Sequence, residues 1–381
     1  MAGFPASRLT ATSNWTALAA GAFESVVDQG AVQDYILKEC PMFYIIDQMG
    51  MMREGAYSHS SIVRVSETDD SQPKSFTGLD PLSKGTVQAP RAMVYPFYNY
   101  DINVTIPWED EITLTGAEAL GDYVEETTFK QARALGARMS DDMVHGNQSD
   151  AKNFLGLEQM VCFTDNTAST ALNGARWNFR LSANTLGGIT RVAHTATTGG
   201  SGAENVSVDM SQLSAAPAST FSLGTNQNGS EAIQCLNHII NVCTYEATTP
   251  DLILSDWKPQ EDMNNAGFGL QRLKQDEKGS VDLGLSISSY KGLKWYASPR
   301  FAHSGVTVTG GSAIDTATNT SIVYVLTSKT WEYRVHKEAN WATIPFLGLT
   351  DQAGAIGRIR NRAQLICKNF ALNAVMANYG E

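Results

Sequence analysis

Hydrophobic and polar residues alternate most regularly between residues 98 and 106. This period of two is typical of a strand with one buried face. The apolar positions of the stretch are Tyr98, Tyr100, Ile102, Val104 and Ile106. A shorter apolar stretch at residues 62–65 predicts an earlier strand, and residues 66–91 contain many Pro, Gly and Asp residues typical of a loop. We therefore expect residues 51–107 to form a long two-stranded excursion.

Residues 115–146 show the three- and four-residue spacing of a helix with one apolar face. Thr115 and Glu118 have the spacing of a capping box, and Gly146 follows as a helix stop. The predicted apolar face consists of Leu120, Tyr123, Val124, Ala132, Leu135, Met139 and Met143. At a rise of ~1.5 Å per residue this helix would be ~45–50 Å long, which suits a structural spine.

Shorter patterns predict the remaining elements, and together they indicate an α+β fold. Residues 1–50 suggest a loose arm with short helices rather than a compact core. Helices are expected at 230–246 and 260–265, and strands at 157–163, 251–255, 286–296, 321–326, 330–336 and 358–367. The strand pair at 286–296 should turn at Lys291 and Gly292.

The long excursion poses a burial problem, because an isolated hairpin is only marginally stable in water. We expect its apolar face to be covered by a second copy of the chain. An aromatic run near the return strand could also stack on nucleic acid bases, but strand packing explains it more simply. The residues expected at this inter-subunit contact are Tyr95, Phe97, Tyr98 and Tyr100.

Composition and charge narrow the classes of partner. The chain has 381 residues, of which 43% are apolar and 18% charged, and its formal net charge is −11. Interface cores contain few charged residues, so this composition suits extensive self-association, although a large monomeric core would give the same values. Extended phosphate binding needs Lys and Arg, so only weak, non-specific contact with DNA is expected.

A basic stripe interrupts the acidic chain near its end. Arg358, Arg360 and Arg362 alternate along a predicted strand and should point to one side. They could form a solvated sheet face, bind carboxylates of a neighbouring subunit or contact packaged nucleic acid. We favour the neighbouring subunit over nucleic acid because the chain as a whole is acidic.

The residues of this chain do not match the sequence motifs that we considered for catalysis or metal binding. The five cysteines include no Cys-x-x-Cys pair, so buried thiols are expected rather than a zinc site. There is no phosphate-binding loop and no nucleophile elbow, and Gly267-x-Gly269 is followed by Arg272 where a dinucleotide site needs Gly. Asp141, Asp142 and His145 lie together near the helix end, and Asp141 and His145, four residues apart, could share a metal, but a solvated helix end is the simpler interpretation. We expect no enzyme activity, cofactor or metal.

The order of these elements resembles that of the major capsid proteins of tailed bacteriophages, which have the Hong Kong ninety-seven type fold. The resemblance covers nearly the whole chain: an arm, a long hairpin and a spine helix precede a helix leading into a buried strand. The segments that carry it are Leu186 to Arg191, Pro250 to Trp257, Tyr290 to Pro299, Trp331 to Val335 and Gln364 to Asn369.

The resemblance implies a division of the chain into five parts. These are an N-terminal arm at 1–50, an extended loop at 51–107, a peripheral domain at 108–225 with the spine helix, an axial domain at 226–345, and C-terminal strands at 346–381 that return to the peripheral domain. It also implies an icosahedral shell of hexamers and pentamers around double-stranded DNA, assembled in the host cytoplasm and located in the virion capsid.

Other expectations follow from the same resemblance. Some members crosslink a loop lysine to a neighbour; Lys74 and Lys84 lie in the matching loop and are expected at the inter-subunit contact, without an identified crosslinking partner. Portal and decoration proteins are further expected partners, and the chain is expected to use either a separate scaffold protein or none. Two alternatives stay open: an encapsulin-type nanocompartment shell, and a hydrolase on an unusual fold.

Overall fold

The computed structural model describes residues 40–56, 60–65, 77, 91–107, 109–110, 117–146, 152–161, 185–186, 189–190, 206–209, 236–237, 239–244, 247–261, 286–302, 321–348 and 354–379. Helices and strands are mixed, which confirms an α+β fold. The chain divides into two compact units. The first comprises Met1–His59, Phe97–Asp142 and Tyr333–Gln364, and the second comprises Ser60–Pro96, Met143–Glu332 and Leu365–Glu381.

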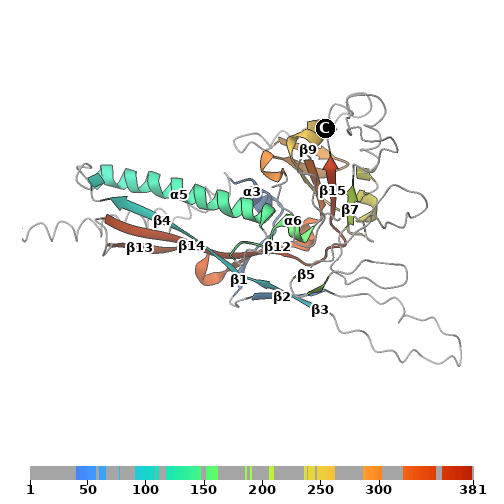
Figure 1. The fold of residues 1–381 in the computed structure, drawn as a ribbon, viewed down its shortest axis with the longest axis horizontal. Coiled ribbons are helices and arrows are strands. Elements are labelled where there is room, and N and C mark those ends of the chain that lie inside the picture. Colours follow the sequence, from blue (N-terminus) through green and yellow to red (C-terminus); the bar gives the residue numbers. More distant parts are fainter. Residues whose placement is uncertain are drawn as a thin grey trace, which may run out of the picture. The chain divides into compact units, whose positions relative to one another are not determined.

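The first unit is built on a five-stranded sheet covered by the long helix α5 (Figure 1). Its strands are β1 (Met52–Ala56), β4 (Tyr98–Pro107), β12 (Trp331–His336), β13 (Ala342–Gly348) and β14 (Gly354–Cys367). The order is β1-β12-β14-β13, and β4 also pairs with β14. The antiparallel register of β4 and β14 runs from Gly354 opposite Pro107 to Ala363 opposite Tyr98.

Helix α5 (Ala117–His145) confirms the predicted spine helix. Its 29 residues span roughly 43 Å at the usual helical rise. The predicted apolar positions with described side chains are buried, apart from the half-buried Tyr123; the buried ones are Val124, Ala132, Leu135, Met139 and Met143. Gly146 follows the last helical residue, as expected. Thr115 and Glu118, the predicted capping box, lie outside the residues whose side chains are described.

The segment before residue 50 contains a core element, contrary to the expectation of a loose arm. Helix α3 (Pro41–Gln48) begins with Pro, which suits the first helical turn because the amide there needs no intrahelical partner. Phe43 packs edge-on against Tyr333, with ring centroids 5.6 Å apart, and lies 6.0 Å from Trp341. The four apolar side chains Met42, Phe43, Ile45 and Ile46 are buried, so α3 belongs to the core of the first unit.

The apolar face of β4 finds its cover within the chain, which corrects the burial argument made from the sequence. Val104 and Ile106 are almost fully buried, and the strand alternates as predicted. Pairing with β14 forms hydrogen bonds along one edge of β4, and α5 lies along the buried face (Figure 1). The periodicity identified the buried face correctly, but it could not show that elements distant in sequence would cover it.

The second unit contains a six-stranded sheet of order β7-β15-β11-β8-β10-β9. Its strands are β7 (Val206–Asp209), β8 (Leu252–Ser255), β9 (Ser286–Tyr290), β10 (Leu293–Ala297), β11 (Ser321–Leu326) and β15 (Ala374–Tyr379). Strands β8, β9, β10 and β11 match the predictions. Strand β15 pairs with β11, so the last strand joins this sheet rather than the sheet that contains β13 and β14. This pairing differs from the expected grouping of residues 346–381.

The turn between β9 and β10 forms at Lys291 and Gly292, as predicted. Both residues have positive φ, 50° and 86°, which is the combination that tight two-residue hairpins need. Helical residues 239–242 fall within the helix predicted at 230–246, and a short helical turn occupies residues 257–261, earlier than the predicted 260–265.

Residues 157–160 form the short helix α6 (Leu157–Met160) instead of the predicted strand. All four side chains are buried, so the segment lacks the alternation that a half-exposed strand would show. The amides of Met160 and Val161 donate to the carbonyls of Gly156 and Leu157, at 3.1 and 2.8 Å, which closes the helical turn. A short apolar run fits a buried helix as well as a strand, and here tertiary burial decides.

Two hairpins complete the described part of the second unit. Strands β2 (Ser60–Val65) and β3 (Arg91–Pro96) pair antiparallel, so β2 pairs with β3 and not with the predicted return strand at 98–106, which is β4 in the other sheet. Strand β5 (Thr185–Leu186) pairs with β6 (Ile189–Thr190). Three of the five cysteines, Cys40, Cys243 and Cys367, are buried free thiols. Burial raises the pKa of the Cys243 thiol to about 12, which keeps it protonated and unreactive.

Candidate interaction surface

The sheet of the first unit has one buried and one open face, and the open face carries the predicted basic stripe. Arg358, Arg360 and Arg362 alternate with buried residues along β14 and are half-buried or exposed. The register places Arg360 opposite Asp101 of β4, so the stripe shares its face with exposed polar residues of β4. The strand geometry therefore brings the three arginines to one surface, as the sequence predicted.

An acidic residue of the same chain already lies among these arginines. The Arg360 Nε is 3.1 Å from Asp101 Oδ2, and the Arg358 Nη1 is 4.0 Å from the same oxygen. The side chains of Arg360 and Asp101 are 49% and 36% exposed, so water screens the contact. The Arg362 guanidinium lies over the Phe97 ring, 5.9 Å from its centroid. Along β4 and β14 this face carries three arginines and one carboxylate, Asp101, so these two strands give it a net positive charge.

The four aromatic residues predicted at the inter-subunit contact are buried within the chain. Tyr95 is fully covered and its hydroxyl donates to the Cys367 carbonyl at 3.0 Å. Phe97, Tyr98 and Tyr100 are 7–8% exposed, and burial raises the pKa of the Tyr98 hydroxyl. These side chains have little surface left for a neighbour, so the reason given for placing them at a contact was wrong. Lys74 and Lys84 lie outside the described residues.

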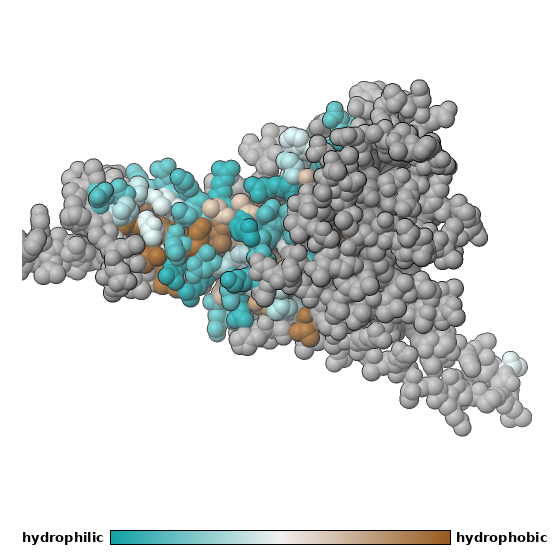
Figure 2. Space-filling model, viewed as in Figure 1, coloured by the Kyte–Doolittle hydropathy of each residue, from teal (hydrophilic) through white to brown (hydrophobic). Residues whose placement is uncertain are grey.

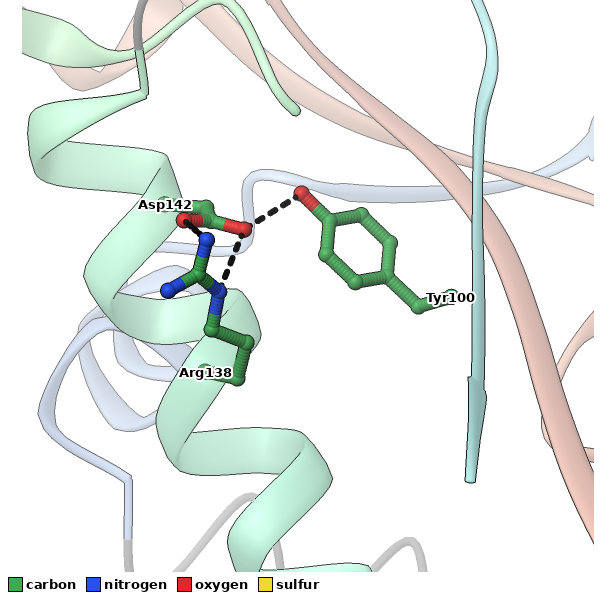
Figure 3. A network of polar contacts seen from close by, with 3 residues as sticks. All are labelled: Tyr100, Arg138 and Asp142. Carbon is green, nitrogen blue, oxygen red and sulfur yellow. Dashed lines mark hydrogen bonds and ion pairs between the residues drawn. The ribbon is translucent and has the colours of Figure 1, made fainter. Parts of the chain in front are cut away.

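Tyr100 instead joins β4 to the helix that covers it (Figure 3). Its hydroxyl donates to Asp142 Oδ2 at 3.0 Å, and Arg138 approaches the same carboxylate with Nε at 3.2 Å and Nη2 at 3.1 Å. Burial raises the pKa of the Asp142 carboxyl, and the charge of Asp141 acts in the same direction, whereas the Tyr100 hydrogen bond and Arg138 lower it. Desolvation is the largest of these effects.

The suggested metal cluster at the end of α5 is divided between separate partners. Asp142 faces Tyr100 and Arg138, whereas His145 Nδ1 lies 2.8 Å from Glu158 Oε1 and its Nε2 lies 3.1 Å from the Arg300 carbonyl oxygen. Among the described residues, no three His, Cys, Asp or Glu side chains form a group that could hold a metal. The interactions of Asp142 and His145 are structural.

The outer face of α5 carries a charge pattern that we did not predict from the sequence. Exposed acidic residues occupy its first half and exposed basic residues follow: Asp122, Glu125, Glu126, Lys130, Arg133 and Arg138. A helical projection of residues 117–145 would have revealed it, because these charges avoid the apolar face. Figure 2 shows hydrophilic residues along this side of α5, with hydrophobic residues gathered below it.

No helix in the described part of the chain has the length and apolar character needed to cross a membrane. Comparison with protein-family models gives no match, and neither does comparison with curated protein sequences. Sequence similarity therefore assigns no family to this chain.

Comparison with solved structures does find similar folds. The capsid protein of cyanophage A-1(L) matches 90% of this chain and 93% of its own, with 12% identity and a TM-score of 0.53. A capsid protein of an empty GTA particle matches 88% and 96%, with 11% identity and a TM-score of 0.49. The SrpI encapsulin of Synechococcus elongatus matches 87% of each chain, with 10% identity and a TM-score of 0.47. The likeness to the cyanophage capsid protein supports a common fold.

Proposed function

Since the chain has the Hong Kong ninety-seven type fold of tailed-phage major capsid proteins, we propose that it is a major capsid protein whose copies assemble into an icosahedral shell around double-stranded DNA. The observation that carries this proposal is the likeness to the cyanophage capsid protein over 90% of the chain. Fold alone does not fix function, so the proposal needs a direct test. Hexamers and pentamers in a virion, assembled in the host cytoplasm, are part of the same proposal.

The two units fit the expected division only in part. We assign the six-stranded sheet to the axial domain and the sheet covered by α5 to the peripheral domain. Strands β12 and β13 belong to the same sheet as β14, so the proposed peripheral domain takes residues 333–364. The proposed axial domain ends at Glu332 and resumes at Leu365. These bounds replace the expected end of the axial domain at residue 345.

The basic stripe is the proposed inter-subunit surface. It lies on a sheet face left open within the chain, and its positive charge suits carboxylates of a neighbouring acidic subunit. Its own Asp101 is half-exposed, so the pairing within the chain can be exchanged at little cost. Lys74 and Lys84 stay in the proposal as contact residues of the extended loop, whereas the buried aromatic residues are withdrawn from it.

The decisive test is electron microscopy of the purified protein, followed by analysis of what the particles contain. We expect closed particles and, when they are isolated from phage-infected cells, nuclease-protected double-stranded DNA. Protein cargo in place of DNA would favour the nanocompartment alternative. A protein that stays monomeric over a wide range of pH and salt, and in infected cells, would contradict a shell function.

The stripe can be tested in the same assay. Replacing both Arg358 and Arg360 by Glu should reduce particle yield, because the surface would then repel the carboxylates of its neighbour. Asp101→Asn is the matched control, since it removes the partner within the chain and leaves the arginines. If the control reduced assembly as much as the arginine variant, the stripe would have only an internal role.

A further inference from the structure

The outer face of α5 is divided into an acidic half and a basic half. Asp122, Glu125 and Glu126 are exposed in the first part of the helix, and Lys130 and Arg133 are exposed near and just after its middle. At 3.6 residues per turn these five residues fall on one side of this part of the helix, opposite the buried Val124, Thr128 and Leu135. The division therefore belongs to a single surface about three turns long.

Two ordinary causes of such a pattern do not account for it. The helix dipole acts within the first and last turns, whereas Glu125 lies about two turns from the start of α5 and Arg133 about three turns from its end. Opposite charges four residues apart would stabilise the helix, but only Glu126 and Lys130 among these residues have that spacing with the acid first. Asp122 and Glu126 have the same spacing with like charges, which is unfavourable in an isolated subunit.

We propose that α5 pairs with α5 of a second copy of this chain, antiparallel across a two-fold axis near residues 128–129. A two-fold contact brings the same surface of both copies together in reverse direction, so the acidic half of each helix meets the basic half of the other. Glu126 then faces Lys130 of the second copy, and Glu125 faces its Arg133. A parallel arrangement would place like charges together.

This inference rests on the proposed shell, because every closed icosahedral shell contains two-fold axes at which identical surfaces meet. One helix face is smaller than a standard interface, and exposed ion pairs contribute little individually. Repetition around a shell makes such weak contacts effective together. Salt screens exposed charges, so this contact weakens as ionic strength rises.

Two charge-reversal variants test the pairing. Glu125→Lys with Glu126→Lys makes the face basic throughout, and Lys130→Glu with Arg133→Glu makes it acidic throughout. Each variant should repel itself and lose about tenfold or more in particle yield, measured by sedimentation and electron microscopy. An equimolar mixture of the two should recover assembly, because each supplies the charge that the other lacks. A chain carrying all four substitutions should also assemble.

The matched control reverses two exposed lysines elsewhere, Lys294→Glu with Lys329→Glu, and should leave particle yield unchanged. Circular dichroism checks that each variant is folded. If a reversed variant unfolds, Glu125→Gln with Glu126→Gln replaces it, and its assembly should lose sensitivity to salt.

The possible outcomes separate the two proposals. If both reversed variants assembled like the wild type, or if mixing them restored nothing, the α5 pairing would be wrong and the shell would stand. If the wild type formed no particles under any condition, the shell proposal would fail and the pairing would fail with it.

Discussion

Asp142 illustrates how the fold assigns a role to a residue that the sequence left ambiguous. In the sequence it stands beside Asp141 and near His145, which suggested a common site at the end of the helix. In the structure its carboxylate is 4% exposed and accepts hydrogen bonds from Tyr100 and Arg138, so it links β4 to α5. A buried carboxylate needs such partners, and the side of the helix that it occupies determines which ones it finds.

The raised pKa of Asp142 predicts how the stability of the first unit depends on pH. The folded state holds the proton more tightly than the unfolded state, so this group stabilises the fold at low pH and loses that contribution as pH rises through its folded pKa. Asp142→Asn removes this loss of stability at higher pH, because the amide does not ionise. The unfolding free energy of the variant, relative to the wild type, should therefore increase from about pH 4 to neutral pH. A decrease for Asp142→Asn over this range would contradict the sign.

Asn373 organises the turn before β15 and offers a second test at this scale. It is fully buried: its Oδ1 accepts from the Thr327 amide at 3.1 Å and from Trp331 Nε1 at 2.8 Å, and its Nδ2 donates to the Asn369 carbonyl at 2.6 Å. Asn373→Ala leaves these buried groups without their partner and should cost about 3 kcal/mol. Denaturant unfolding measures the loss. Ala371→Ser, at an exposed position nearby, should change stability by less than about 0.5 kcal/mol.

Among the elements, α5 follows most directly from the sequence. Its spacing predicted the buried side, and the described side chains match it because a helix turns its residues through a fixed angle. Helix α6 and the predicted strand at 157–163 show the opposite case, since a short apolar run has no period that separates a helix from a strand.

Met139 tests the packing of α5 on its sheet. Its side chain is fully buried on the predicted face, so Met139→Ala should reduce the unfolding free energy by about 3 kcal/mol through lost burial and a residual cavity. Ala134→Ser on the exposed side should change it by less than about 0.5 kcal/mol. Chemical unfolding followed by circular dichroism distinguishes them; equal effects would mean that α5 is not held by this face.

The turn between β9 and β10 depends on the conformational freedom of Gly292. Its φ of 86° is unfavourable for any residue with a Cβ atom, although the space around it is open. Gly292→Ala should therefore destabilise the protein by about 1 kcal/mol. The control is Gly50→Ala, which has a similar positive φ and open space and should cost a similar amount. A neutral effect at Gly292 alone would show that the hairpin tolerates another turn.

For the whole molecule, the charge balance limits what a shell subunit can do with nucleic acid. The formal net charge is −11, and the described basic stripe is partly neutralised by Asp101. Phosphate contacts require cations, so the isolated subunit should bind double-stranded DNA only weakly. Enclosure of DNA by such a shell would depend on geometry rather than on affinity.

Fluorescence anisotropy with labelled duplex DNA measures this directly. We expect half-saturation above about 100 µM at physiological salt, without sequence preference. Lowering the salt concentration should strengthen the binding only slightly, because few phosphates are contacted. Micromolar binding at physiological salt, with a steep salt dependence, would instead indicate a dedicated DNA-binding surface.

By itself, the sequence determined the α+β class, the spine helix, the hairpin at Lys291 and Gly292, the buried face of β4 and the common side of the three arginines. Each of these depends on residues close together in the chain, where a fixed rotation or alternation sets which side is buried. Only the tertiary structure decided what covers each face. Strand β4 pairs with β14 about 250 residues away, and β15 pairs with β11 and β7. The periodicity of the residues shows which face of an element is buried. Packing between segments distant in the sequence decides which element covers that face.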